Sequence, residues 1–428
     1  MKKILVLIFM MILAVGLVAC GDDETSGNTE NNTGNDAGNN TENNAGDDAT
    51  NDEVEEVELA QGVTDSTVTV GSIGAQSGPF AAIGTPYYGG MEAYFDMINE
   101  QGGVNGRTIE LIKKDDEFAP DKAVAAMEEL VYDEEVFAIV GQLGTPGVMA
   151  TITTVQEEGI PSVYFGTGAK QLTEAGENFF PVQPNYYYEG KLMSKFAVEE
   201  LGAENIVIIY RNDDVGKDGL EGFKEGLTAL GKGSISEELA VNGTDTDFTV
   251  QIQKAKAANP DAVILYGLLA ETSGLLKEIE KVDFNVDMIT TYSNADASFL
   301  ALASQGAPNV IKNLHVMGWV DATEEGMAPL VDAMAKYSPD APVNAYTIAG
   351  WVAAETFVAG LKATGDNLSW EGFIEAMNGL TFTEGLAPDI SYVDGKREGV
   401  TKMAMSKVVQ DDSGAYIFEQ ETDFIEFE

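Results

Sequence analysis

Residues 70–123 constrain the fold of this chain more than any other part of its sequence. A short apolar strand runs into Ser77-Gly78-Pro79, and a helix follows with apolar residues at helical spacing. A Gly/Asn turn then leads to a second strand at 108–113, and Pro120 suits the first turn of a second helix. Strands and helices in this alternation form parallel sheets with right-handed crossovers. We therefore predict a doubly wound α/β fold.

The first twenty residues have the pattern of a secretory signal sequence. Lys2 and Lys3 precede an apolar run at 4–19 that is short for a membrane span, and Cys20 follows. The sequence Leu-Val-Ala-Cys matches a bacterial lipobox, in which the cysteine is lipidated; the alternative is a transmembrane anchor that ends in a chance cysteine. We predict a lipoprotein signal peptide at 1–20. Because Cys20 is the only cysteine, the sequence excludes an internal disulfide and a cysteine-based metal or redox site.

Residues 21–60 are composed largely of Asn, Thr, Gly, Asp, Glu, Ser and Ala. Such a segment buries too little apolar surface to offset its ordering entropy, so we predict a disordered acidic tether. The whole chain has a formal net charge of -47, which makes nucleic acid an unsuitable partner. One interpretation of the acidic surface is a store for cations. We favour instead a solvated surface suited to a saline or alkaline exterior.

Two glycine- and threonine-rich loops follow predicted strands. The strand predicted at 136–140 leads into 141–147, and the strand predicted at 160–165 leads into 166–169, with a helix predicted at 148–158 between them. Both loops should lie side by side at the carboxyl ends of parallel strands, where open α/β sheets bind ligands. Backbone amides and threonine hydroxyls at helix starts suit an anionic group such as a carboxylate.

A second α/β series follows a predicted crossover at 181–188. A return crossover is predicted at 316–320, after which two helices should pack back on the first series. The tail, with turn signals at 393–396 and 411–414, predicts hairpin strands. We predict two lobes joined by a hinge of several crossovers that closes around a ligand. Lobe 1 comprises 61–185 plus 318–385, and lobe 2 comprises 186–317 plus 386–428. The strands expected in the second series are at 205–210, 234–241, 261–266 and 287–292, and its helices are at 216–230, 248–258 and 272–282. The two helices expected to pack back on the first series are at 324–336 and 346–363.

Six segments, in order, resemble the branched-chain-amino-acid-type solute-binding proteins of ABC importers. They are SGPFAAIG, INEQGGVNGR, DDEFAPDKA, AIVGQLGTPG, EEGIPSVYFGTGA and RNDDVGKDGLEGF, and the likeness covers about 67–410. The resemblance implies a type I periplasmic-binding-protein fold that captures a small carboxylate-bearing solute, such as a branched-chain or other amino acid. It implies ABC permease subunits as partners. Together with the lipobox, it places a monomer on the extracellular face of the cytoplasmic membrane, anchored through Cys20, as in Gram-positive binding lipoproteins.

The resemblance also indicates residues for the ligand. Thr145 matches the hydroxyl that binds the ligand carboxylate, and Gly166 and Thr167 match further polar contacts. The amino-acid binders hold the ligand ammonium with a glutamate in the segment matching 290–297, which has no glutamate here, so Tyr292, Asn294 or Asp296 would substitute. In the segment matching 213–217, Val215 stands where these proteins usually have a tyrosine. The motif IPSVYFGTGA is more similar to the branch of the family that binds aromatic or aliphatic acids and amides. Such ligands stay an alternative.

Other candidate ligand residues have a structural alternative. Thr145 and Thr167 could be helix N-caps, and Gln142 could satisfy the backbone instead of reaching the cleft. Ser77 and Phe80 could line the cleft rim, or serve as a turn residue and a core aromatic. Four tyrosines are candidate cleft aromatics or packing residues: Tyr186, Tyr266, Tyr292 and Tyr346.

Catalytic motifs do not stand out in the sequence. His315, the only histidine, is expected to be packed in a strand, and the loop at 141–147 is no Walker A. Asp115-Asp116-Glu117 is interpreted as a solvated strand end rather than a catalytic or Ca²⁺ group. We expect no enzyme activity, no catalytic residue, no cofactor and no metal. A module that senses ligands for a membrane receptor is a further alternative with the same binding chemistry, whereas a carboxylate-based hydrolase is disfavoured.

Overall fold

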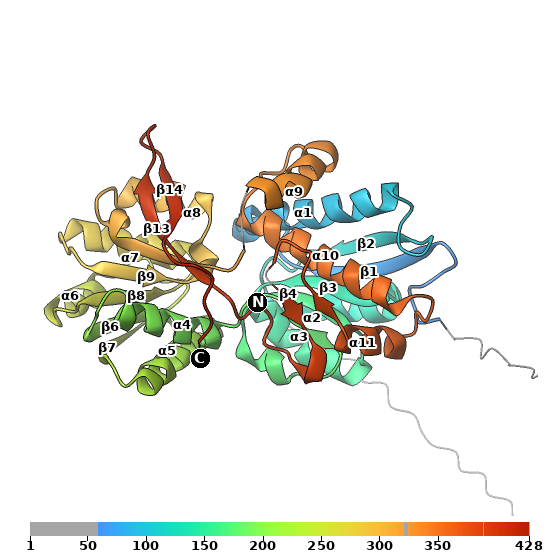
Figure 1. Ribbon diagram of the computed structural model, residues 1–428, viewed down its shortest axis with the longest axis horizontal. Coiled ribbons are helices and arrows are strands. Elements are labelled where there is room, and N and C mark those ends of the chain that lie inside the picture. Colours follow the sequence, from blue (N-terminus) through green and yellow to red (C-terminus); the bar gives the residue numbers. More distant parts are fainter. Residues whose placement is uncertain (1–58, 321–323, 388, 428) are drawn as a thin grey trace, which may run out of the picture. The chain divides into compact units, whose positions relative to one another are not determined.

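Two β-sheets form the framework of the chain. The computed structural model describes residues 59–320, 324–387 and 389–427. Within them lie a five-stranded sheet, a seven-stranded sheet and a two-stranded ribbon (Figure 1). The predicted signal peptide at 1–20, with Cys20, and nearly all of the predicted tether at 21–60 lie outside the described residues.

The five-stranded sheet is parallel and has the strand order β2-β1-β3-β4-β5. β3 is buried along its whole length, as expected for a parallel strand with both faces covered. The order reverses between β1 and β3, and ligands of open α/β sheets bind beyond the carboxyl ends of strands at such a point. The strands are β1 (Thr67–Ile73), β2 (Thr108–Lys114), β3 (Ala138–Leu143), β4 (Ser162–Gly166) and β5 (Phe179–Phe180).

The seven-stranded sheet has the order β14-β13-β10-β9-β8-β6-β7, which reverses between β6 and β8. β6 to β10 are parallel, and the β13–β14 hairpin continues the sheet antiparallel to β10. The strands are β6 (Asn205–Arg211), β7 (Ser234–Val241), β8 (Ala262–Tyr266), β9 (Asp287–Thr290), β10 (Leu314–Gly318), β13 (Ala404–Gln410) and β14 (Tyr416–Gln420).

Helices cover the sheets, and buried apolar clusters lie on both faces of each sheet. α9 and α10 pack on α1, as predicted, and Figure 1 shows α10 beside α1. The helices are α1 (Ala81–Glu100), α2 (Pro120–Glu128), α3 (Thr145–Glu158), α4 (Tyr186–Glu199), α5 (Asp214–Leu230), α6 (Thr249–Ala257), α7 (Leu269–Lys281), α8 (Ala297–Gly306), α9 (Glu324–Tyr337), α10 (Ala345–Thr364) and α11 (Trp370–Asn378). Short elements are η1 (Gly78–Phe80), η2 (Glu129–Asp133), η3 (Lys170–Glu174), η4 (Tyr292–Asn294), η5 (Val310–Asn313), η6 (Val393–Gly395), β11 (Thr381–Phe382) and β12 (Ile390–Ser391).

The strands and helices that were predicted occur in the predicted order, with differences at their ends. Three helices were not predicted, namely α4, α8 and α11, and α4 begins at Tyr186, inside the crossover predicted at 181–188. The helix predicted from 148 begins at Thr145, because Gly144 adopts a φ of 109° and turns the chain directly after β3. The strand predicted to reach 292 ends at Thr290, and η4 begins at Tyr292. The hairpin at 411–414 is confirmed, whereas the turn at 393–396 lies in η6.

The chain passes between the two sheets three times, after β5, after β10 and before β13. β10 ends at Gly318, so it occupies the first half of the crossover that was predicted at 316–320. β12 pairs with β11, although residue 390 falls in the segment assigned to lobe 2. The lobe boundaries themselves stay a prediction.

The edge strands of the sheets are short or charged. β5 has two residues. β2 carries Glu110 and Lys113, and β7 exposes Glu237 and Glu238. Such edges discourage pairing with a strand of another chain. Among the described residues, no helix is both long enough and apolar enough to cross a bilayer.

Helices α4 and α5 approach so closely that glycines replace side chains between them. A β-carbon on Gly222 would lie 1.8 Å from the carbonyl oxygen of Tyr187, and one on Gly190 would lie 2.2 Å from the carbonyl oxygen of Gly219. Both distances are far inside van der Waals contact. The backbones of the two helices therefore touch, which fixes the position of α4.

We expect Gly222→Ala to lower the free energy of unfolding by about 1–3 kcal/mol, because the methyl group must force α4 and α5 apart. This loss would appear although alanine favours helix by about 1 kcal/mol. Urea denaturation followed by circular dichroism measures the change. Thr228→Ala, at an exposed position of the same helix, is the control and should stay within about 0.5 kcal/mol. Equal stability of the Gly222→Ala protein and the wild type would contradict the close contact.

Candidate functional site

The two predicted threonine loops lie side by side, as expected. Leu143 at the end of β3 pairs with Gly166 at the end of β4, so both strands deliver their loops to one edge of the sheet. The Oγ1 atoms of Thr145 and Thr167 are 2.7 Å apart, and both residues are buried. Thr145 is the first residue of α3, where backbone N–H groups lack helical acceptors.

Gly166 serves the packing of the same edge. A β-carbon at this position would lie 2.5 Å from Cδ1 of Leu143, so a larger residue would push the two strands apart. Its carbonyl oxygen accepts a hydrogen bond from the N–H of Gly144 at 3.2 Å. Gly166 therefore holds the two loops together, and its contact with a ligand stays a prediction.

Tyr186 connects the two threonines to elements of the other sheet. It is the first residue of α4, which Asn185 caps by accepting a hydrogen bond from the N–H of Tyr188. Burial raises the pKa of the Tyr186 phenol, and the nearby side chains of Thr145 and Thr167 oppose this effect. The Tyr186 ring stacks on that of Tyr292, with 5.9 Å between ring centres.

Tyr292 and Tyr266 complete this group of side chains. The Tyr292 hydroxyl donates to the carbonyl oxygen of Pro184 at 2.9 Å and accepts from Nε2 of Gln183 at 2.8 Å. The ring of Tyr266, at the end of β8, meets that of Tyr186 edge to face at 6.3 Å. We call Thr145, Thr167, Tyr186, Tyr266 and Tyr292 the threonine–tyrosine cluster. Its five members were all predicted as ligand residues, and the structure brings them together.

Asn294 connects the ends of β8 and β9 next to this cluster. Its Nδ2 donates to the carbonyl oxygen of Gly267 and to Oγ1 of Thr290, each at 2.9 Å. Its Oδ1 is buried and has no hydrogen-bond partner among the described residues. Asp296 accepts from the N–H of Ala345 at 3.0 Å and so connects the loop before α8 to the start of α10. Neither residue has an established ligand contact.

Glu189 is the residue of this region that the sequence reading missed. It lies in the first turn of α4 and is fully buried. Its Oε1 accepts from the N–H of Tyr292 at 2.6 Å, and its Oε2 accepts from Oγ1 of Thr291 at 2.9 Å and from the Tyr266 hydroxyl. The available signal was its position three residues after Tyr186, on the apolar face of the helix. A glutamate therefore does reach the segment 290–297, but it comes from α4.

The remaining predicted residues lie outside the cluster. Gln142 is buried, and its amide exchanges hydrogen bonds with the Thr151 side chain, which is neither a backbone partner nor a ligand contact. Ser77 is exposed in the turn before η1. Tyr346 is half-buried at the start of α10, and burial raises its pKa, with Asp296 and Tyr186 close enough to add to the shift.

Phe80 stacks on Phe118, with ring centres 4.1 Å apart and planes at 13°. Glu117 and Phe118 both adopt positive φ angles, of 50° and 65°, which is unusual for residues with side chains. The ring of Phe118 fills the space where a β-carbon of Gly144 would lie, at 2.7 Å. The two phenylalanines therefore pack beside the loop that carries Thr145.

The prediction of a solvated strand end at 115–117 is wrong for Asp116. Asp115 is exposed and accepts from the N–H groups of Gln76 and Glu117, but Asp116 is only 1% exposed. Burial raises the pKa of Asp116, whose Oδ2 has no hydrogen-bond partner among the described residues. The neighbouring acids suggested a solvated group, whereas the second carboxylate turns inward and accepts from the N–H of Phe118 at 2.8 Å.

His315 is packed in its strand, which confirms the expectation. It is buried on β10, its ring lies 5.2 Å from that of Phe196, and Nδ1 is 2.6 Å from Oε2 of Glu421. Within the described residues, no group of three or more His, Cys, Asp or Glu side chains is arranged to hold a metal ion.

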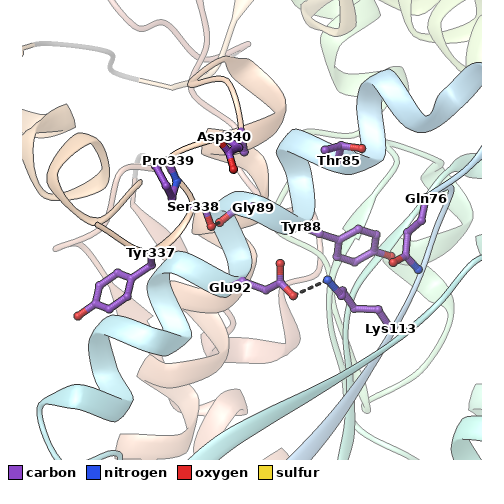
Figure 2. Close-up of a pocket in the computed structure, with 11 residues that line it drawn as sticks. Gln76, Thr85, Tyr88, Gly89, Glu92, Lys113, Tyr337, Ser338, Pro339 and Asp340 are labelled. Atoms are coloured by element: carbon purple, nitrogen blue, oxygen red, sulfur yellow. Dashed lines mark hydrogen bonds and ion pairs between the residues drawn. The ribbon is translucent and has the colours of Figure 1, made fainter. Parts of the chain in front are cut away.

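A pocket of about 430 Å³ lies elsewhere, beside α1 and β2 (Figure 2). Tyr88 and Glu92 from α1 face Lys113 from β2, and residues 337–341 form the opposite wall. The Lys113 ammonium pairs with Glu92 and lies 5.6 Å from the ring centre of Tyr88. None of the predicted ligand residues lines this pocket. It is therefore separate from the threonine–tyrosine cluster.

Comparison with known proteins identifies the family to which this chain belongs. A family model described as "Periplasmic binding protein" matches residues 67–414. An "Amino acid binding protein" of Pseudomonas aeruginosa is 27% identical over 215 residues, which are 50% of this chain and 57% of that protein. The match therefore spans little more than half of that relative. "Leu/Ile/Val-binding protein homolog 3" of Brucella melitensis is 26% identical over 303 residues, or 70% of this chain and 79% of that protein.

Solved structures share the fold. A fatty acid ABC transporter substrate-binding protein from Thermomonospora curvata matches with a TM-score of 0.76 and 21% identity, covering 87% of this chain and 95% of that one. The branched-chain amino acid binding protein LivJ of Streptococcus pneumoniae, in complex with isoleucine, matches at 0.69 and 20%, covering 83% and 100%. A solute-binding protein of R. palustris in complex with benzoate matches at 0.70 and 19%, covering 85% and 98%. These likenesses confirm the predicted two-lobed type I fold.

The hydroxyl pair of Thr145 and Thr167 should show energetic coupling. We expect Thr145→Val and Thr167→Val each to lower the free energy of unfolding by about 1 kcal/mol, because each leaves a buried hydroxyl short of a partner. The double variant should lose less than the sum, by about 0.5–1.5 kcal/mol. Urea denaturation of the four proteins measures this coupling. Thr153→Val, at an exposed site on α3, should instead add to Thr145→Val within about 0.5 kcal/mol. Strict additivity of the buried pair would contradict their hydrogen bond.

Proposed function

This chain belongs to the periplasmic binding protein family, and on that premise we propose that it is the substrate-binding component of an ABC importer. The solute it captures is a small molecule with a carboxylate group. Capture requires no bond to be made or broken: one half-site holds the ligand, the other closes over it, and the closed form docks on permease subunits.

The threonine–tyrosine cluster is the observation that carries this proposal. Thr145 and Thr167 bring two hydroxyls to within 2.7 Å of each other at the start of α3. Neutral hydroxyls and unpaired helix N–H groups bind a carboxylate without the need for a positively charged side chain. In this proposal a ligand carboxylate replaces the Tyr186 phenol or the hydroxyl–hydroxyl contact as their partner.

Two ligand classes fit this arrangement. Branched-chain or other amino acids are the leading candidates, in keeping with the printed names of the relatives. Aromatic or aliphatic acids and amides are the alternative, favoured by the absence of a glutamate within 290–297 and by the ligands in the titles of the fatty-acid and benzoate neighbours. A ligand-sensing module for a membrane receptor would use the same binding chemistry.

A thermal-shift panel tests the ligand assignment. It covers leucine, isoleucine, valine, benzoate, 4-hydroxybenzoate, octanoate and simple amides. A ligand of the folded state stabilises it by about 2.7 kcal/mol at one hundred times its Kd, which raises the melting temperature. We expect at least one carboxylate to give such a shift and Thr145→Ala to remove it.

Thr153→Ala is the matched control and should keep the shift, because Thr153 is an exposed residue of the same helix. A shift that persists in Thr145→Ala would remove the threonine from the site. No shift with any carboxylate would reject the proposed solute class.

We further propose that Cys20 carries a lipid that holds the protein on the extracellular face of the membrane. The support is the Leu-Val-Ala-Cys sequence after an apolar run of signal-peptide length. A lipid chain together with the acidic tether would leave the binding domain free of the bilayer surface.

Fractionation of cells that express the full chain tests the anchor. We expect the wild type to label with palmitate and to sediment with membranes, and Cys20→Ala to lose the label and leave the membrane fraction. Ser26→Ala, a nearby change in the tether, should behave as the wild type. Membrane association of Cys20→Ala without any label would instead favour a transmembrane anchor.

A further inference from the structure

We propose that Glu189 is the positioning residue of the second half-site and that its protonation state sets how firmly the segment after β9 is held. This inference rests on the proposed function of the same cluster, and it adds a regulatory group that is not expected to touch the ligand.

The contacts of Glu189 reach two strand ends at once. Its Oε1 accepts from the N–H of Tyr292, and its Oε2 accepts from the hydroxyls of Thr291 and Tyr266. Tyr266 ends β8, and Thr291 follows the end of β9. One carboxylate on α4 therefore holds both neighbouring strands at their carboxyl ends, where a binding half-site is formed.

Tyr186 joins this contact to the first half-site. It precedes Glu189 by three residues on α4, so the two side chains share a face of the helix. Its phenol lies close to the side chains of Thr145 and Thr167, and its ring stacks on Tyr292. A shift of Tyr292 would therefore be transmitted through the Tyr186 ring to the two threonines.

The electrostatic setting of Glu189 is unusual, because all its partners are neutral. The titratable groups that face it are Tyr266 from β8, Tyr292 from the loop after β9 and Tyr186 from its own helix. Among the described residues, no lysine, arginine or histidine pairs with it. Burial raises the pKa of Glu189 to about 7, against the opposing effect of hydrogen bonds from Tyr266, Tyr292 and Thr291.

The two protonation states need different hydrogen bonds. The ionised carboxylate only accepts, and it satisfies three donors. A protonated carboxyl must donate one hydrogen, and a hydroxyl of Thr291 or Tyr266 can rotate to accept it, whereas the N–H of Tyr292 can only donate. Protonation keeps one acceptor for Tyr292, rearranges the other two contacts and removes a buried charge that has no cationic partner, so the protonated carboxyl holds the segment more firmly than the ionised one.

Glu189→Gln tests the proposal without a ligand. The amide keeps the shape, an acceptor for Tyr292 and donors for the two hydroxyls, but it has no proton to exchange. Because the folded state holds the proton more tightly than the unfolded state, Glu189 lowers stability as pH rises from about 4.5 to about 7. We expect the melting temperature of Glu189→Gln minus that of the wild type to rise by at least about 2 °C between pH 5.5 and pH 8.5.

Two controls isolate this effect. Glu199→Gln makes the same charge change at the exposed end of α4 and should follow the wild type at every pH. Glu355, a half-buried glutamate whose pKa desolvation raises to about 7, is present in all three proteins, so its contribution cancels in the differences. A melting-temperature difference for Glu189→Gln that does not change with pH would overturn the proposal.

Hydrogen–deuterium exchange over residues 288–296 gives the readout for positioning. After correction for intrinsic exchange, protection in the wild type should decrease from pH 6 to pH 8, because ionisation of the buried carboxyl favours opening, and protection in Glu189→Gln should not change. Equal pH dependence in both proteins would assign Glu189 a packing role only and overturn the inference.

A bound probe extends the test to affinity. Benzoate, a monoanion, should bind the wild type more weakly as pH rises from 6 to 8, because the ionised Glu189 repels it, whereas its Kd for Glu189→Gln should not vary. Parallel pH profiles would overturn the coupling to affinity. If no carboxylate of the thermal-shift panel binds the wild type, the proposed function fails by itself, and the ligand-free measurements still decide the role of Glu189.

Discussion

The backbone contact between α4 and α5 is the constraint on which the candidate site depends. Because Gly190 and Gly222 leave no side chain between the helices, α4 can neither rotate nor slide without a clash. Its first turn is therefore fixed relative to the sheet that α5 covers. That turn carries Tyr186 toward the threonines and Glu189 toward the ends of β8 and β9. A contact of two helices thus determines how two half-sites meet.

Much of the fold could be predicted because it follows from local pattern. Alternating strands and helices imply parallel sheets, and parallel strands deliver their loops to one edge, so the adjacency of Thr145 and Thr167 was predictable from order alone. Element ends were less accurate where one residue changes the backbone direction. Gly144, with its φ of 109°, starts α3 three residues before the predicted helix. The β13–β14 hairpin followed from its turn residues.

The partners of individual side chains could not be predicted, because they come from distant segments. Glu189 accepts hydrogen bonds from residues about one hundred positions later, and no nearby sequence pattern predicts these donors. Asp116 stands between two acidic neighbours, which suggested solvation, and only the tertiary structure shows that it is buried. The sequence alone did not decide whether Gln142 reaches the cleft or has a structural role. Its hydrogen bonds to Thr151, within the same strand–helix unit, give it a structural role.

The edges of the sheets give the acidic composition a physical meaning. At high concentration, copies of one protein come into frequent contact. Sheet edges are where two such copies would join backbone to backbone. Here Glu237 and Glu238 occupy one edge, so each copy meets its twin with the same charge at that surface. The acidic side chains of two copies therefore repel each other at an exposed sheet edge, and salt weakens this repulsion by screening it.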